Sequence, residues 1–145
     1  MSSRQRSRRP AEAGSAALEL VVLAPILLAL LGLVIAAGRV SIAQSAVNAA
    51  ARDAARQASI ALGPYAAQAA GQASARAALR RDGLACTAIV AIDTRGFDTP
   101  PGQPAWVAAT VTCTVGLSRL YLPGLPGHKT LTAYFRSPLD VYRSR

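Results

Sequence analysis

Two cysteines are the residues of this 145-residue chain that could react with each other. Cys86 and Cys113 each lie where apolar and polar residues alternate, which is typical of a β-strand with one buried face. An antiparallel hairpin with Cys86 opposite Cys113 would bring the two sulfur atoms within reach of a disulfide. The same register gives three further apolar pairs, namely Ala88–Val111, Val90–Ala109 and Ile92–Val107. We therefore predict a disulfide between Cys86 and Cys113, with two free buried thiols as the alternative interpretation.

Other reactive residues are too few and too scattered for a catalytic or metal site. The chain has one histidine, His128, and lacks a motif of paired carboxylates, a nucleophile elbow and a glycine-rich phosphate loop. His128 and the two cysteines do not have the spacing of metal ligands. We therefore expect no enzyme activity, no metal or other cofactor and no small-molecule substrate.

Basic residues outnumber acidic ones by 16 to 7, which gives a formal net charge of +9. Such a chain could bind nucleic acid or an anionic surface. No stretch interleaves basic with aromatic residues as a single-strand-binding groove does, so we expect no nucleic-acid partner. Four arginines instead precede the longest apolar run: Arg4, Arg6, Arg8 and Arg9.

That apolar run extends without a charge from Leu20 to Gly38. At ~1.5 Å per residue, a helix of this length nearly matches the ~30 Å hydrocarbon core of a bilayer. More arginines precede Glu19 than follow at Arg39, which predicts a cytoplasmic N-terminus, a single span in the cytoplasmic membrane and an extracytoplasmic remainder. A cleaved signal peptide with its cut near Gly38 is the alternative, although the run exceeds the ~7–15 residues of such a segment.

The elements around these residues predict an α+β fold that begins with a basic cytoplasmic leader, 1–14, and a long helix, 15–62. Its transmembrane part covers about 20–38, and its outer part carries an apolar stripe: Ile42, Ala43, Ala46, Val47, Ala50 and Ala54. Polar residues four apart line the other side: Gln44, Asn48, Arg52 and Arg56. Gly63 and Pro64 end this helix, and a second helix is expected over 65–82, with Gly83 as its cap.

Beyond Gly83 the period changes to two, which predicts an extracytoplasmic domain, 84–145, with a small antiparallel sheet of about three strands. The third strand should turn Leu131, Ala133 and Phe135 inward. The second should turn one set of residues away from its apolar face: Trp106, Thr110, Thr112 and Thr114. A proline- and glycine-rich loop follows the first strand, and a turn at 122–127 joins the second and third.

The junction before the apolar run carries the most specific pattern. Gly14 is followed by small residues, Glu19, an apolar stretch and Pro25. Further positions continue the pattern: Arg39, Asn48, Ala50, Ala51, Arg52, Ala55 and Arg56. Over residues 14–56 the sequence resembles the TadE-like pseudopilins of the tight-adherence pilus machinery, and TadF-like siblings share this layout. Leu20 stands where the family often has Phe.

The resemblance implies a structural role in a type IV-related pilus assembly or secretion system. A prepilin peptidase would cut after Gly14, leaving Ser15 as the new N-terminus and Glu19 as the fifth residue. The Glu19 carboxylate would then pair with the amine of a neighbouring pilin or pseudopilin, and a carboxylate that reaches the lipid headgroups is the alternative. The alternative function is a membrane-anchored or secreted small binding domain with an ordinary signal or anchor.

Three further sets of residues on the long helix have two interpretations each. Pro25 either kinks the membrane helix or is tolerated within it. Gly32 and Gly38 either permit close helix packing or are likewise tolerated. Arg52 and Arg56 either contact an assembly partner or belong to a solvated helix face.

Overall fold

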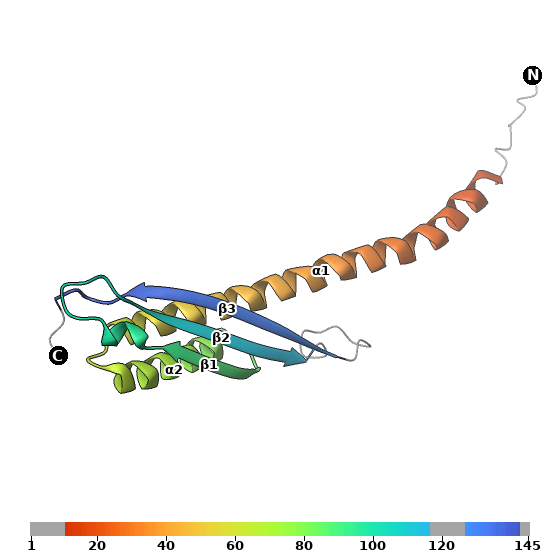
Figure 1. Ribbon diagram of the computed structural model, residues 1–145. Coiled ribbons are helices and arrows are strands. Elements are labelled where there is room, and N and C mark those ends of the chain that lie inside the picture. The colour runs from red at the N-terminus through yellow and green to blue at the C-terminus, as the bar shows by residue number, and fades with distance from the viewer. Residues whose placement is uncertain (1–10, 117–126, 143–145) are drawn as a thin grey trace, which may run out of the picture. The chain divides into compact units, whose positions relative to one another are not determined.

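The computed structural model describes residues 11–116 and 127–142 (Figure 1). In the first helix, side chains are described from residue 19 onward. Most of the predicted leader and most of the predicted turn at 122–127 lie outside the described residues. The chain separates into two units, Met1–Ala37 and Gly38–Arg145, and the first helix contributes residues to both.

The described elements confirm the predicted α+β fold, with a long apolar N-terminal helix, a second helix and a three-stranded antiparallel sheet. Their order is α1 (Ala11–Ser59), α2 (Pro64–Arg81), β1 (Thr87–Asp93), η1 (Arg95–Asp98), β2 (Trp106–Gly116) and β3 (His128–Pro138). The short 3-10 helix η1 was not predicted and lies in the loop after β1.

Small side chains allow the second part of α1, from Gly38 to Ser59, to pack closely against α2. Ala54 of α1 and Ala75 of α2 are fully buried. Gly71 of α2 lies at a point of close approach, because a β-carbon there would be 3.2 Å from the backbone oxygen of Ala54 and 2.8 Å from Ile92 Cδ1. Each buried alanine removes little area from water, so this core gains modestly from the hydrophobic effect.

The prediction that Ile42 belongs to the apolar stripe was wrong. Ala43, Ala46, Val47, Ala50 and Ala54 are buried, whereas Ile42 is 71% exposed. Because an α-helix turns about 100° per residue, each step of four residues drifts by about 40° around the helix. Ile42 therefore lies about 120° from Ala54 and falls off the buried face.

Helix α2 ends in a motif that requires glycine. The amide of Leu84 donates to the carbonyl of Leu79 at 2.9 Å, and the amide of Gly83 donates to the carbonyl of Arg80 at 3.1 Å. This is the Schellman pattern, in which the residue after the cap adopts a left-handed conformation. Gly83 does so with a φ of +67°, so the chain turns directly from α2 toward β1.

The sheet has the order β1-β2-β3, and one of its faces packs against the two helices. Alternate residues of each strand enter the core, with Val90, Val111 and Leu131 among them. Phe135, predicted to face inward, is 38% exposed at the rim of this core. The opposite face of the sheet carries the polar residues of the alternation, as predicted for Trp106 and the threonines of β2.

The predicted register of the first hairpin was wrong by two residues. Cys113 is the cross-strand partner of Ala88, and Val90 pairs with Val111. A slip of two keeps every side chain on its original face, so apolar alternation cannot distinguish the two registers. Cys86 lies just before the first residue of β1, yet it shares the inward-facing parity of the strand.

The second part of α1 follows the outer edge of β3. The side-chain amide of Gln44 donates to the backbone oxygen of Thr132 at 3.1 Å, and the hydroxyl of Ser137 donates to that of Ser59 at 3.0 Å. An edge strand carries backbone groups that lack a strand partner, and a covering element protects such an edge from unwanted pairing.

Candidate functional site

Gly14 and Ser15 lie in the first turns of α1, where the backbone is helical. Glu19 follows Ser15 by four residues, which is about one turn of the helix. The Glu19 side chain is exposed at the start of the apolar stretch. The structure thus puts the potential cleavage position and the carboxylate on one continuous helix.

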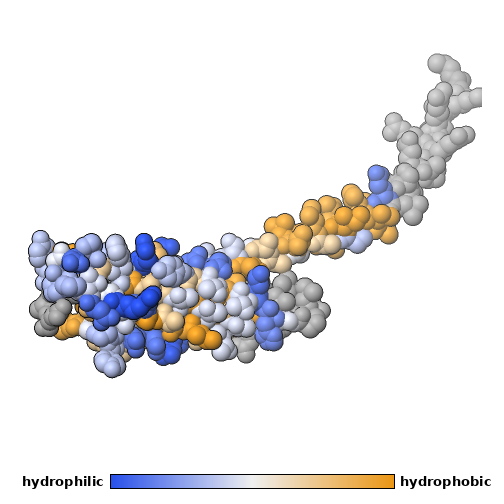
Figure 2. Space-filling view, in the orientation of Figure 1, coloured by the Kyte–Doolittle hydropathy of each residue, from blue (hydrophilic) through white to orange (hydrophobic). Residues whose placement is uncertain are grey.

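The apolar stretch that follows is uncovered. Leucines, isoleucines and valines from Leu20 to Ile35 are exposed, and Leu23, at 47%, is the most buried of them. Figure 2 shows the same stretch as a largely apolar surface. Soluble proteins rarely expose contiguous apolar patches beyond a few hundred Å², so this surface requires an apolar environment. By length and composition, α1 contains a candidate membrane span with a mean hydropathy of 3.0.

Pro25 does not interrupt α1. The helix is continuous from Ala11 to Ser59 with Pro25 inside it. A proline removes one backbone hydrogen-bond donor, and its ring crowds the carbonyl four residues earlier. Neither effect ends the helix here.

The predicted polar stripe of α1 is divided between the sheet and the solvent. Gln44 bonds to β3, and its amide also donates to the Asn48 side chain at 3.2 Å. The Arg52 guanidinium lies over the Phe135 ring, 5.7 Å from its centroid. Arg56, one turn further, is exposed at the surface. Arg52 and Arg56 therefore have different surroundings despite their regular spacing.

Cys86 and Cys113 form a disulfide with a Cα–Cα distance of 5.6 Å. Cys113 is completely buried in the core between the sheet and the helices, whereas Cys86 is partly exposed. The bond fixes the segment between α2 and β1 to the central strand. The disulfide therefore has a structural role, and neither cysteine has a free thiol.

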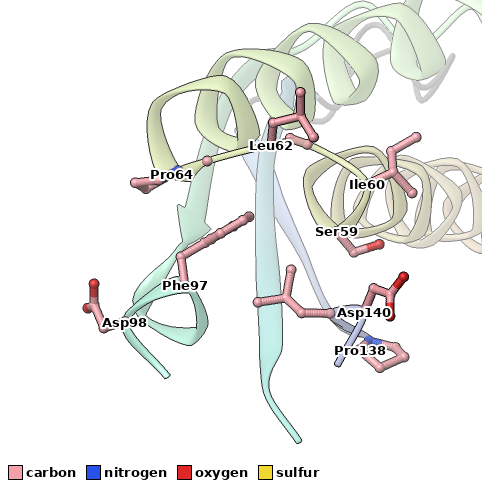
Figure 3. Close-up of a pocket in the computed structure, with 11 residues that line it drawn as sticks. Ser59, Ile60, Leu62, Pro64, Phe97, Asp98, Pro138 and Asp140 are labelled. Carbon is pink, nitrogen blue, oxygen red and sulfur yellow. The ribbon is translucent and has the colours of Figure 1, made fainter. Parts of the chain in front are cut away.

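A hollow of about 940 Å³ lies where the end of α1 meets η1 and the end of β3 (Figure 3). Sequence reasoning did not predict it. Ile60 and Leu62 line it with exposed side chains, and Phe97 lines it from η1. Its one serine, Ser59, donates its hydroxyl proton to the Arg56 carbonyl at 2.9 Å, so this hydroxyl is not arranged as a nucleophile beside a base.

Ion pairs in the described residues join neighbouring segments of the chain. Arg81 bridges Asp53 of α1 at 3.3 Å and so joins the two helices. Hydrogen bonds from the Arg95 side chain and backbone lower the pKa of Asp93 to about 2. No group of three or more His, Cys, Asp or Glu side chains that could hold a metal ion occurs within 11–116 and 127–142.

A second gathering of side chains was also missed by sequence reasoning. Trp106 of β2 and Arg136 of β3 meet on the outer face of the sheet, which is turned away from the helices, and Tyr134 lies two residues from Arg136 on the same face. The alternation placed each residue on a face, but only the pairing of β2 with β3 brings the three together. The register of β2 with β3 would have to be known from the sequence to predict that these residues are neighbours.

Comparison with known proteins identifies a family for part of the chain. Residues 14–56 match the family model of TadE-like proteins. The matched segment contains Gly14, Glu19, the uncovered apolar stretch, and Arg52 and Arg56. No curated protein and no solved structure matches the chain.

Proposed function

We propose that this chain is a pseudopilin-like membrane component of a tight-adherence pilus assembly or secretion system. The observation that carries the proposal is the TadE-like match over residues 14–56, whose apolar part is an uncovered helix. A family match implies a component associated with this pilus, and the exposed helix supports membrane anchoring. The role is structural: the protein is processed, packs by its helix in the membrane and presents its outer domain to partners.

In this proposal a prepilin peptidase cuts after Gly14 on the cytoplasmic side. The new amine of Ser15 is mostly protonated at neutral pH, because α-amino groups have pKa values of about 8. A carboxylate beside lipid is costly unless it is paired or reaches water. Glu19 therefore pairs with the Ser15 amine of a neighbouring pilin or pseudopilin. This contact can form only after processing, because cleavage creates the amine.

The mass of the mature protein purified from its native membrane tests the processing step. We expect a species that begins at Ser15, and we expect Gly14→Ala to prevent its formation. Gly38→Ala is the matched control, because it replaces the glycine at the site of a conventional signal-peptide cut and leaves the Gly14 junction intact. This variant should still yield a chain that begins at Ser15.

Two results would overturn the proposal in cells with an active prepilin peptidase. A full-length chain would indicate an ordinary membrane anchor. A chain that begins near Arg39 would indicate a secreted domain. Either result would favour a small binding domain over a pseudopilin.

A further inference from the structure

The outer face of the sheet presents aromatic, guanidinium and hydroxyl side chains that the proposed function does not use. Trp106 of β2 is 49% exposed and Tyr134 of β3 is 61% exposed. The Arg136 guanidinium lies over the Trp106 ring, 5.5 Å from its centroid. In the described part of the chain, Arg136 forms no salt bridge, so its charge is not neutralised by a carboxylate of this unit.

These groups lie along one line across the face. Tyr134 pairs with Thr110, and Trp106 precedes Thr110 by four residues on β2. At ~3.3 Å per strand residue the two rings are separated by roughly 13 Å along the sheet, with Arg136 between them. Most other side chains of the face are threonines, and the Thr112 and Thr132 oxygens lie 3.5 Å apart, while Ile89 of β1, at 68% exposure, is an aliphatic side chain on the same face. Its threonines are Thr87, Thr110, Thr112, Thr114, Thr130 and Thr132.

The chemistry of this face fits a sugar chain that carries carboxylates. Pyranose rings present flat C–H faces that stack on aromatic rings, and their hydroxyls exchange hydrogen bonds with threonine and arginine. A guanidinium binds a carboxylate through two parallel hydrogen bonds. Arg136 can therefore bind a carboxylate of the sugar chain, and Trp106 and Tyr134 offer aromatic rings on which its sugar rings can stack.

Two other occupants fit less well. Nucleic acid carries one phosphate per nucleotide, so its binding requires several cations along the strand. This region has Arg136 and Arg95, and Arg95 is already held by Asp93 at 2.5 Å. A second copy would bring the same Arg136 and the same net charge of +9, while stable protein interfaces have apolar cores that the threonines do not supply.

We propose that the outer face of the sheet binds an acidic polysaccharide, with sugar rings on Trp106 and Tyr134 and a carboxylate on Arg136. The binding uses the strands alone and is independent of processing at Gly14. It adds a ligand to the protein rather than a step to its assembly.

Fluorescence offers a direct test because Trp106 is the single tryptophan of the chain. The full chain in neutral detergent micelles is titrated with polygalacturonate at physiological ionic strength, and in parallel with its methyl ester, which masks the carboxylates. We expect a saturable change in emission with polygalacturonate. Methyl esterification should weaken binding by about tenfold, as expected for loss of a charge-assisted hydrogen-bonded contact.

Arg136→Gln and Arg56→Gln form a matched pair of variants. Both remove one exposed guanidinium and lower the net charge equally, but Arg56 lies on α1, away from the outer face of the sheet. Arg136→Gln should raise the Kd for polygalacturonate about tenfold, and Arg56→Gln less than twofold. Circular dichroism checks that both variants are folded.

Three outcomes would overturn the proposal. One is the absence of any fluorescence change in the unmodified chain. Another is an equal loss with Arg56→Gln, which would show diffuse attraction between a polyanion and a basic protein. The third is tighter binding of single-stranded oligothymidylate that also depends on Arg136, which would make this a nucleic-acid surface.

Discussion

Cys86 is bonded to Cys113, although the cross-strand neighbour of Cys113 is Ala88. The bond thus reaches diagonally from the segment before β1 to the buried face of the central strand. It closes a loop that contains β1, η1 and most of β2. In a core made largely of alanine, this link carries a large share of the stability.

Replacing both cysteines by alanine should therefore markedly lower the stability of the unit Gly38–Arg145, called the outer unit after the proposed topology. The bond joins residues 27 positions apart, and the chain-entropy model gives about 3.5 kcal/mol for a loop of this size. Thermal unfolding of the wild type and of Cys86→Ala/Cys113→Ala, each with and without reductant, measures the difference. Reductant should destabilise the wild type only, and a loss below about 1 kcal/mol would contradict a major role for the bond.

Gly83→Ala should destabilise the outer unit by about 1–2 kcal/mol, because its φ of +67° is costly for a residue with a β-carbon. Crowding is not the cause, since no neighbouring atom lies within 4 Å of the position that the alanine methyl would occupy. Gly63→Ala is the control: its surroundings are equally open, but its backbone is extended, so the change should stay within about 0.5 kcal/mol. Chemical denaturation of both variants checks the contrast, which equal losses would refute.

Ala54→Leu should cost about 1–3 kcal/mol by overpacking the contact between α1 and α2. Ala54 is fully buried, and its backbone approaches Gly71 closely. Ala77→Leu on the exposed side of α2 should change stability by no more than about 0.5 kcal/mol. If urea unfolding showed both leucines to be tolerated alike, the two helices would not be in close contact.

The ion pair between Asp93 and Arg95 predicts a small loss of stability in acid. The pKa of Asp93 falls from 3.8 to about 2 on folding, so the stabilising effect is complete above about pH 4 and disappears as pH falls toward 2. The Asp93 side chain is 39% exposed, which limits the effect to less than about 1 kcal/mol. Asp93→Asn should be less stable than the wild type at pH 6 and equally stable at pH 2. A difference that grows on acidification would refute this assignment.

Glu19→Gln should leave processing at Gly14 intact but reduce assembly by about tenfold, because it removes the charge proposed to pair with the Ser15 amine. Glu12→Gln is the control, since cleavage would remove residue 12 from the mature chain. Cross-linking of the protein to its pilin or pseudopilin neighbours in membranes measures assembly. Equal cross-linking in Glu19→Gln and wild type would favour a carboxylate that only reaches the headgroups.

Local patterns were sufficient to predict the two α-helices and the three strands of the fold, although not the short helix η1. The breaks at Gly63 and Gly83 and the change from helical to strand period after Gly83 are properties of short stretches, and the helices and strands follow them. The buried parity of β1 and β2 follows equally from alternation. These features require no knowledge of distant contacts.

What sequence patterns could not predict depends on pairing between distant segments. The register of β1 with β2 differed by two residues because both alternatives bury the same side chains. The contact of Arg52 with Phe135 and the gathering of Trp106 with Arg136 depend on where strands and helix meet. Nothing in the spacing of these residues along the chain distinguishes them from ordinary exposed positions.

The alanine-rich contact between α1 and α2 also has a thermal consequence. The heat capacity of unfolding rises by about 0.45 cal/mol/K for each Å² of apolar surface exposed, and buried alanines expose little of it. The outer unit should therefore unfold with a heat capacity change below the usual ~12–15 cal/mol/K per residue. Its free energy of unfolding should then vary along a shallow curve, so that cooling and moderate warming alter its stability less than they do in a domain filled with leucine and phenylalanine.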